Sequence, residues 1–268
     1  VSDEALREIA ANYTREPGVR QLERFLAKLL RKAATKLASA AVQPGLVIET
    51  TNLREYLGRP RFTPEAHERT SVPGVATGLA VTGLGGDVLF VEASALDGTS
   101  QGSGPGSLTL TGQLGEVMKE SAQIALSYVR AHAERLGITD RSILDRHIHV
   151  HVPAGAVPKD GPSAGVTMVT ALTSMALNRP VRSDVGMTGE VTLNGRVLPI
   201  GGVKQKLLAA QRAGLTTVFV PKRNEPDLDD VPADVLESLT VHVVGDVRDV
   251  VLGALSAPAA ESAGSAAA

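Results

Sequence analysis

Two short stretches of the sequence contain the residue types needed to make and break acyl bonds. The first runs from Pro158 to Gly165 and reads Pro-Lys-Asp-Gly-Pro-Ser-Ala-Gly, with Ser163 as the candidate nucleophile. The second begins at Gly201-Gly202 and contains two lysines, Lys204 and Lys206. A serine hydroxyl becomes a strong nucleophile when a neighbouring base takes its proton, and a neutral lysine amine is such a base. The two stretches therefore predict acyl transfer by a serine and a lysine.

Pro162 predicts that Ser163 lies where a helix begins. The proline ring fixes φ at a helical value, and its missing N–H would have no partner in the first turn. Unpaired backbone N–H groups and the positive end of the helix dipole favour an anion, such as a tetrahedral acyl intermediate. The backbone amides of Ser163 and Ala164 are therefore candidate oxyanion donors. A serine at this position can also act only as a helix cap, and this alternative stays open.

Helical periodicity separates the two lysines. Residues 203–213 have a helical pattern and are followed by Gly214, a common residue just after a helix C-terminus. At about 100° per residue, Lys206 falls on the apolar stripe and Lys204 points elsewhere. Burial lowers the pKa of a lysine and leaves free amine near neutral pH, so we expect Lys206 to be the base. The alternative is that its stem covers the apolar face while its ammonium reaches water.

Three linked motifs in this order closely resemble those of the Lon protease family. They are the stretches Pro158 to Gly165, Met187 to Leu193 and Gly195 to Lys206, and the similarity runs from residue 1 to about residue 255. The family uses a Ser-Lys dyad, and its spacing points to Ser163 and Lys206. The resemblance implies a serine endopeptidase of the endopeptidase La type. Such enzymes degrade misfolded, unfolded and regulatory proteins with ATP, through an acyl-enzyme.

The resemblance also implies supporting residues around the dyad. Thr188 would hydrogen-bond the neutral amine and orient it, although a β-branched residue that only fills a strand is the alternative. Asp160 would position or block the nucleophile, and Glu190 is the third supporting residue.

The first 58 residues predict a small helical subdomain. Apolar residues recur at helical spacing in two segments and precede a short helix at 52–57; they are Leu6, Ile9, Ala10 and Tyr13, then Leu22, Phe25, Leu26, Leu29, Leu30, Ala33 and Leu37. The resemblance is to the last helical subdomain of an AAA+ ATPase module, in which the arginine matching Arg20 senses nucleotide. A solvated arginine is the alternative.

The sequence contains no G-x-x-x-x-G-K-[ST] phosphate loop, and the glycine-rich stretch Gly102 to Gly106 is interpreted as a loop tip. Peptide hydrolysis would need no cofactor, whereas ATP and Mg²⁺ are implied for the full-length protein.

The remaining sequence predicts an α+β protein in which the helical subdomain is followed by a mixed α/β proteolytic domain, ribosomal protein S5 domain 2-like by resemblance. Prolines and charges mark a linker at 59–73, the proteolytic domain spans 74–255, and a tail rich in Ala, Ser, Gly and Pro at 256–268 should be disordered. Helices are expected at 113–136, 163–178 and 203–213. Asn194-Gly195 predicts a two-residue hairpin turn. Strands are expected at 75–81, 87–93, 107–111, 147–152, 185–188, 191–193, 196–198, 216–221 and 241–244.

Composition limits the partners that we expect. Cysteine is absent, which excludes thiol nucleophiles, disulfides and cysteine-ligated zinc. The net charge is −2, from 27 basic and 29 acidic residues without a sustained basic block, so no nucleic-acid partner is expected. No apolar run approaches the length of a membrane span, and the acidic start is not a signal peptide, so we expect a soluble cytoplasmic protein without a membrane partner. The resemblance implies unfolded polypeptide substrates, a hexameric ring, and the N-terminal and ATPase core regions of the same protein as partners.

Three alternative interpretations remain. His147, His149 and His151 alternate along a strand and could share a metal, but no carboxylate stands beside them, so we interpret them as the polar face of a half-buried strand and expect no metal. Gly161-Pro162-Ser163-Ala164-Gly165 also fits the G-x-S-x-G nucleophile elbow of α/β-hydrolases, which needs a later histidine and offers only His242. Finally, the chain could be a catalytically silent Lon-like module for oligomerisation or substrate binding.

Overall fold

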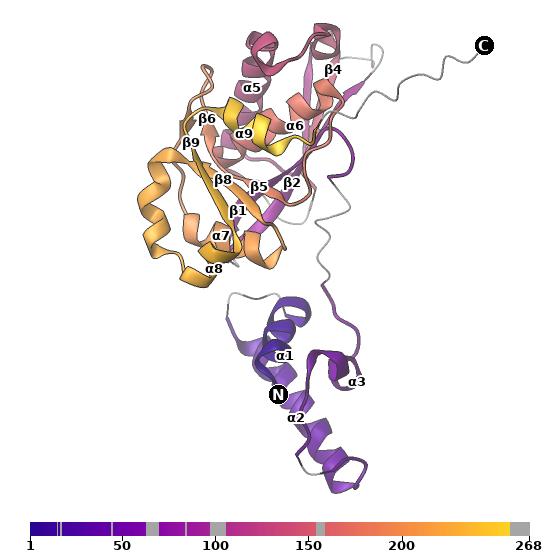
Figure 1. Cartoon of the computed structure of the whole chain (residues 1–268). Helices are drawn as coiled ribbons and strands as arrows, with labels where there is room; N and C mark the ends of the chain where they lie inside the picture. Colours follow the sequence, from indigo (N-terminus) through magenta and orange to yellow (C-terminus); the bar gives the residue numbers. More distant parts are fainter. Residues whose placement is uncertain are drawn as a thin grey trace, which may run out of the picture. The chain divides into compact units, whose positions relative to one another are not determined.

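The computed structural model describes residues 1–14, 16, 18–43, 45–62, 70–83, 85–96, 106–153 and 159–257. They divide into two compact units, one of residues 1–65 with 82–85 and one of residues 66–81 with 86–268 (Figure 1). The loop tip predicted at 102–106 lies outside the described residues except for Gly106, and so do residues 63–69 of the predicted linker and residues 258–268 of the predicted tail.

The first unit is helical, as its periodicity predicts. Its elements are α1 (Asp3–Glu8), a π-helical turn (Ile9–Tyr13), α2 (Arg20–Ala38), a 3-10 turn (Thr50–Asn52) and α3 (Leu53–Leu57). Its core contains Ala5, Ile9, Tyr13, Leu29, Ala33, Ile48, Leu53, Tyr56 and Leu57. The hydroxyl of Tyr13 donates to the carbonyl of Gly58 at 2.9 Å, so the polar end of this buried ring is satisfied.

The apolar stripe of α2 is narrower than predicted. Leu29 and Ala33 are buried, but Leu30 and Leu37 are 56% and 40% exposed. Leu30 follows Leu29 by one residue, and this rotates its side chain by about 100° away from the core. Only one side of α2 is therefore covered within this unit.

The second unit contains a seven-stranded mixed sheet, which confirms the predicted α+β class. The strands are β1 (Val75–Thr82), β2 (Gly85–Leu96), β3 (Leu108–Thr111), β4 (His147–His151), β5 (Val185–Met187), β8 (Thr217–Pro221) and β9 (Thr240–Val244). Their order in the sheet is β3-β4-β2-β1-β5-β8-β9. β4 pairs parallel with β3 and antiparallel with β2, whereas β1, β5, β8 and β9 are all parallel.

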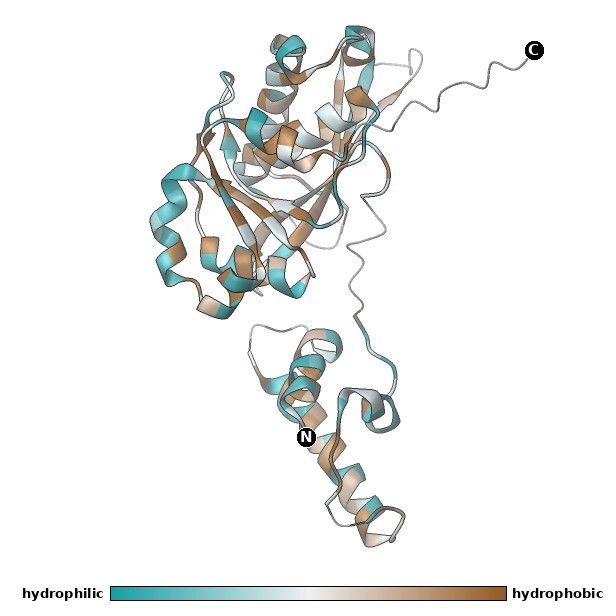
Figure 2. Cartoon of the chain, in the orientation of Figure 1, coloured by the Kyte–Doolittle hydropathy of each residue, from teal (hydrophilic) through white to brown (hydrophobic). Residues whose placement is uncertain are grey.

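Helices cover both faces of this sheet. The covering helices are α5 (Glu116–Ala131), α6 (Gly165–Leu177), α7 (Val203–Arg212), α8 (Ala233–Ser238) and α9 (Val247–Ala254). On β8, Phe219 faces the cluster that contains α5, α6 and α9, whereas Val218 and Val220 face the cluster with α7 and α8 (Figure 1). A strand buried on both faces has apolar residues in succession, as β8 has, and Figure 2 shows such residues gathered in the strands.

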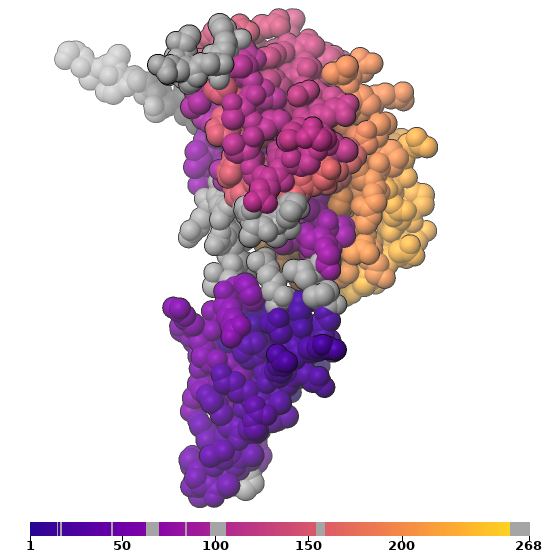
Figure 3. Space-filling model, turned by 180° about the vertical axis from the view of Figure 1, so that it is seen from behind, coloured from indigo at the N-terminus to yellow at the C-terminus, as the bar shows by residue number. Residues whose placement is uncertain are grey.

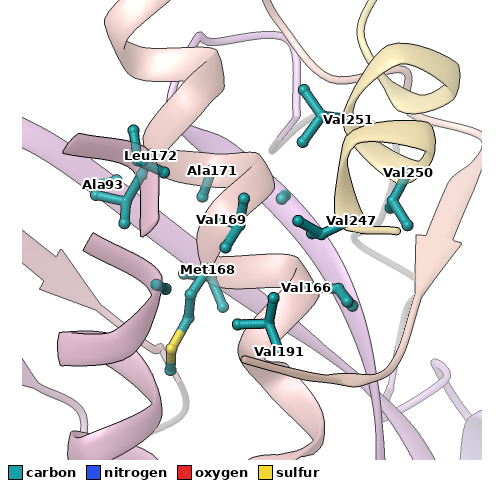
Figure 4. Close-up of a cluster of buried hydrophobic side chains, with 14 of the residues drawn as sticks. Ala93, Val166, Met168, Val169, Ala171, Leu172, Val191, Val247, Val250 and Val251 are labelled. Atoms are coloured by element: carbon teal, nitrogen blue, oxygen red, sulfur yellow. The ribbon is translucent and has the colours of Figure 1, made fainter. Parts of the chain in front are cut away.

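The nucleophile motif leads directly into α6, the most buried helix of the unit. Every residue from Gly165 to Met175 is buried. Apolar side chains of α6 pack with those of α9 and β6 (Glu190–Val191) in one cluster (Figure 4). The buried hydroxyl of Thr170 donates to the carbonyl of Val166, one turn earlier in the helix, at 2.8 Å. The polar side of this helix is thus buried as well.

α5 begins three residues later than predicted. Gln113 is left-handed with φ 56°, and Leu114 forms a parallel bridge with Lys159, so the helix starts only at Glu116. Val117, in the first turn of α5, is 45% exposed. The outer side of α5 forms part of the surface in Figure 3.

The Asn194-Gly195 turn is one residue longer than predicted. β6 pairs with β7 (Val197–Leu198), and Thr192 N–H donates to the carbonyl of Arg196 at 3.0 Å, which leaves a three-residue loop. Gly195 alone takes the left-handed conformation, with φ 83°, whereas a two-residue turn of type I′ would need positive φ at both central residues.

No helix of the described segments is long and apolar enough to span a bilayer.

Candidate active site

Ser163 lies in a single 3-10 turn, Pro162–Ala164, that leads into α6. Gly161 precedes this turn with φ 112°, a conformation that favours glycine. The predicted helical start is therefore present, but it is a 3-10 turn before it becomes an α-helix. The carbonyl of Ser163 accepts hydrogen bonds from the N–H of Gly189 at 2.9 Å and from the Thr188 hydroxyl at 3.3 Å. The backbone of the nucleophile is thereby fixed to the segment after β5.

α7 carries Lys206 into the protein interior. Gly202 forms the N-cap of α7 in the left-handed conformation, and Lys206 lies one turn into the helix. The side chain of Lys206 is 3% exposed, whereas Lys204 is exposed to solvent. The prediction that Lys206 lies on the apolar face of this helix is confirmed.

Burial changes the chemistry of the Lys206 amine. Desolvation lowers the pKa of Lys206 from 10.5 to about 8, because an ammonium group loses its hydration in the interior. Its Nζ donates to the hydroxyl oxygen of Thr188 at 2.9 Å, and Thr188 is itself only 1% exposed. Among the described residues, no ion pair joins Lys206 to a carboxylate that would stabilise its charged form.

Thr188 has a fixed direction in this chain of hydrogen bonds. A hydroxyl has one proton to donate, and that of Thr188 goes to the carbonyl of Ser163 at 3.3 Å. In this arrangement Thr188 accepts a hydrogen bond from Lys206. In the neutral amine, the lone pair is then directed elsewhere than Thr188 and stays available to take a proton.

Ser163 and Lys206 are separated by 43 residues in sequence, and Thr188 joins them in the structure. The link consists of two hydrogen bonds, from the Lys206 amine to Thr188 and from Thr188 to the Ser163 backbone. Within the described part of the chain, no hydrogen bond joins the Ser163 hydroxyl itself to Lys206. A direct proton transfer therefore requires the hydroxyl of the half-buried Ser163 to come within hydrogen-bonding distance of the amine.

Asp160 caps α5 from a distant position in the sequence. One of its carboxylate oxygens, Oδ1, accepts the N–H of Met118 at 3.0 Å and that of Gly161 at 2.8 Å. A Cβ on Gly115 would lie 2.2 Å from the carboxyl carbon of Asp160, so glycine at this N-cap leaves the room that the carboxylate occupies. A carboxylate at a helix N-terminus is stabilised by the unpaired N–H groups and the dipole. Asp160 thus joins the segment that leads to Ser163, called the nucleophile loop below, to the N-terminus of α5.

Lys159 is a second anchor of this loop, one that sequence reasoning did not single out. Its ammonium donates to the carbonyls of Gly112 at 3.1 Å and Val152 at 3.4 Å, the residues that directly follow β3 and β4. Burial lowers the pKa of Lys159. Its backbone also pairs with Gln113 and Gly115. The only sequence signal for this role was the position of Lys159 beside Asp160.

Glu190 and Arg20 are the remaining predicted site residues. Glu190 begins β6 opposite Leu198 and is half-buried. Arg20 is exposed and is the first residue of α2. The backbone N–H groups of the next two residues, Gln21 and Leu22, donate to the Glu16 carboxylate at 2.6 and 3.0 Å. Among the described residues, no hydrogen bond joins Glu190 to Ser163 or Lys206. Their predicted roles stay predictions.

The three histidines of β4 are paired with hydroxyl groups. Nδ1 of His147 lies 2.5 Å from the Ser107 hydroxyl, and the Thr111 hydroxyl lies between Nε2 of His149 at 2.9 Å and Nδ1 of His151 at 2.7 Å. They share one face of the strand, as its alternation predicts. Within the described ranges, no group of three or more His, Cys, Asp or Glu residues is arranged to hold a metal.

The geometry does not favour a nucleophile elbow. An elbow places its serine directly at the end of a strand, whereas β4 ends at His151 and Ser163 lies in a 3-10 turn. His242, the histidine that this alternative requires, lies on β9 and stacks on Phe219 with 5.0 Å between ring centroids. No hydrogen bond of the described residues links His242 to Ser163.

Comparison with known proteins agrees with the motifs. The family model of the Lon protease (S16) C-terminal proteolytic domain matches residues 47–257, and that of the Lon protease AAA+ ATPase lid domain matches residues 1–44. A Lon protease of Mycolicibacterium smegmatis is 70% identical over 268 residues, which are 100% of this chain and 33% of that protein. Lon proteases of Salinispora arenicola and Frankia alni are 66% and 65% identical over 256 and 250 residues, which cover 95% and 93% of this chain and 32% and 28% of those proteins. The chain thus spans about a third of the length of these curated relatives. It belongs to the Lon protease family.

Proposed function

We propose that this chain is the peptidase part of an ATP-dependent serine endopeptidase, with Ser163 as nucleophile and Lys206 as its base. One observation carries the proposal most directly: a buried lysine with a lowered pKa is hydrogen-bonded to Thr188, which holds the backbone of Ser163. Membership in the Lon protease family supports the peptidase class.

In the proposed reaction, the neutral amine of Lys206 takes the proton from the Ser163 hydroxyl. The serine oxygen attacks the peptide carbonyl, and the backbone amides of Ser163 and Ala164 donate to the resulting oxyanion. The Lys206 ammonium then gives its proton to the leaving amine, and an acyl ester remains on Ser163. Water, deprotonated by the same amine, hydrolyses this ester and restores both residues.

The lowered pKa makes a lysine base practicable at neutral pH. With a pKa of about 8, about one tenth of Lys206 is neutral at pH 7, whereas an ordinary lysine would be neutral in only about one molecule in 3,000. Thr188 adds orientation, because it accepts from the amine and leaves the lone pair free for the serine.

The proposal for the whole protein extends beyond this chain. ATP and Mg²⁺ would bind in the ATPase core of the full-length protein, since this sequence has no phosphate loop. Arg20, exposed at the start of α2, would approach the nucleotide there. Unfolded polypeptides would be the substrates, and the full-length chains would assemble as hexameric rings.

A fluorophosphonate probe, which labels activated serines, tests the dyad directly. We expect Ser163 to be labelled in this chain and in the full-length protein, and Ser163→Ala and Lys206→Met to abolish labelling. The matched controls are Lys204→Met, two residues away and exposed, and Ser127→Ala on the exposed side of α5. Both controls should be labelled at the wild-type rate.

Casein degradation with ATP and Mg²⁺ by the full-length protein extends the test to the substrate. Both dyad variants should stop degradation while the protein stays folded. If Ser163 is unlabelled in a folded wild-type protein and casein is not degraded, the chain is a silent platform and the proposal is wrong.

A further inference from the structure

Asn224 is a buried amide whose hydrogen bonds are directed at the backbone of another segment. It lies in the 3-10 segment Lys222–Asp230 that follows β8, and it is 4% exposed. Its Oδ1 accepts the N–H of Ile200 at 2.9 Å, and its Nδ2 donates to the carbonyl of Ile200 at 2.8 Å. Nδ2 also donates to the carboxylate of Asp227 at 2.6 Å. Burying an amide is costly unless it is fully paired, and this one is paired on both sides.

The residue that Asn224 holds lies just before the helix that carries the lysine. β7 ends at Leu198, and α7 starts at Val203 after its N-cap Gly202. Ile200 lies between them, and its N–H and C=O pair with the Asn224 side chain as they would pair with a neighbouring strand. A Cβ on Gly201 would meet no atom within 4 Å, whereas one on Gly202 would lie 2.6 Å from the Val81 side chain, so the connection borders open space at Gly201 and is closely packed again at the N-cap of α7. Asn224 is therefore the side chain that fixes the Ile200 end of this connection.

The strand that leads to Asn224 also holds Thr188. The carbonyl of Phe219, in β8, accepts the N–H of Thr188 at 3.0 Å. The same strand continues through Pro221 to Asn224, which holds Ile200 and the start of α7. Thr188 and Lys206, which meet at 2.9 Å, are thus both positioned from β8.

We infer that Asn224 is a positioning residue that holds the start of α7 against β8 and so sets the contact between Lys206 and Thr188. The inference rests on the proposed function, in which Lys206 is the base. If Asn224 is released, α7 can shift at its first turn, the contact with Thr188 lengthens, and water reaches the amine. The rate of the serine should fall because less neutral amine is available at neutral pH.

Paired substitutions separate this role from simple stabilisation. Asn224→Asp keeps the shape and the acceptor for Ile200 N–H, but it removes the donor and brings two carboxylates together at positions 224 and 227. The double variant combines Asn224→Asp with Asp227→Asn. The amide at position 227 can then donate to the carboxylate at position 224, and only the carbonyl of Ile200 lacks its donor. Asp227→Asn alone leaves both bonds to Ile200 in place and is the control.

The readout is the titration of Lys206 itself, followed by NMR on this chain with ¹³C-labelled lysine and assigned by the loss of one signal in Lys206→Met. The wild type and Asp227→Asn should titrate with the same midpoint near 8. The double variant should titrate at least one pH unit higher, with about tenfold less neutral amine at pH 7. The rate of fluorophosphonate labelling at pH 7 should fall by the same factor and recover at higher pH.

The outcomes distinguish the inference from the proposed function. If wild-type Lys206 titrates near 10.5, the proposed function fails, and the inference fails with it. If the wild type titrates near 8 and the folded double variant does the same, only the inference is overturned. Should the double variant not fold, Asn224→Ser, which replaces the amide with a smaller hydroxyl group, is titrated with the same two outcomes. Loss of folding in both variants would show a purely structural role and would also overturn the inference.

Discussion

The Nζ atom of Lys206 lies 2.9 Å from the hydroxyl oxygen of Thr188, and the hydroxyl of Thr188 donates in turn to the backbone of Ser163. This relationship joins three segments that are distant in sequence, and it contains no carboxylate. Burial removes the hydration of the ammonium group, which is the physical reason for the lowered pKa of Lys206.

The labelling rate of Ser163 should rise with pH through a midpoint near 8. Lys206 acts as a base only when neutral, and the neutral fraction grows as the pH passes the lowered pKa. Rates measured with the fluorophosphonate probe from pH 6 to pH 10 give this profile. Lys204→Met should leave the midpoint unchanged. A rate that is flat over this range would mean that Lys206 is not the base.

Lys206→Met should stabilise the folded chain at neutral pH. The unfolded lysine keeps its ordinary pKa of 10.5 and the folded one has a pKa of about 8, so below pH 8 folding must bury a charge. This gap corresponds to a cost of about 3 kcal/mol, reduced by about 1 kcal/mol for the hydrogen bond to Thr188. As the pH rises from about 8 to about 10.5, only the unfolded lysine still holds its proton, and the cost disappears.

Urea unfolding at pH 7 and pH 10 measures this difference in free energy of unfolding. Lys206→Met should be more stable than wild type by about 2 kcal/mol at pH 7, and the advantage should vanish by pH 10. Lys204→Met, on the exposed side of the helix, should show no pH-dependent difference. An advantage that persists unchanged at pH 10 would contradict a desolvated ammonium as its cause.

Thr188→Val should slow labelling of Ser163 by about 100-fold. Valine has the same shape and suits the extended backbone, but it neither accepts from the amine nor donates to the Ser163 carbonyl. Thr188→Ser keeps the hydroxyl and should remain within about tenfold of the wild-type rate. Thermal unfolding of both variants shows whether the fold is intact. Equal rates in valine and serine variants would assign Thr188 a packing role only.

Gly115→Ala should detach the nucleophile loop from α5. The added Cβ would lie 2.2 Å from the carboxyl carbon of Asp160, so the carboxylate must leave the N–H of Met118. We expect a loss of about 1 to 3 kcal/mol in free energy of unfolding and a changed labelling rate of Ser163. Gly245→Ala is the matched control, because a Cβ there meets no atom within 4 Å. An unchanged labelling rate in Gly115→Ala would mean that Asp160 does not position the nucleophile.

Local patterns predicted most of the elements and the burial of Lys206. The three-to-four residue period of α7 was sufficient to separate Lys206 from Lys204, because a helix face is determined by residues that are close in sequence. The strands β8 and β9 were predicted to within one residue for the same reason. Asn194-Gly195 predicted a turn but not its length, which depends on how Arg196 pairs with Thr192.

Contacts between distant segments could not be predicted in this way. The late start of α5 depends on Asp160 and Lys159, more than 40 residues away, which pair with its first turn. Asn224 resembles any polar residue of a surface loop until the structure places it against Ile200. The exposure of Leu30 likewise depends on which neighbours cover α2. Periodicity tells which face is apolar, and only tertiary structure tells how much of that face is covered.

The burial of α6 on every side has a consequence for how this protein would lose its function under heat. A helix with no solvent-facing residue from Gly165 to Met175 has no low-cost opening of its own, so its amide protons should exchange with deuterium only when the whole unit opens. Thermal inactivation and global unfolding should then coincide, and the nucleophile should keep its place in the backbone until the core itself melts.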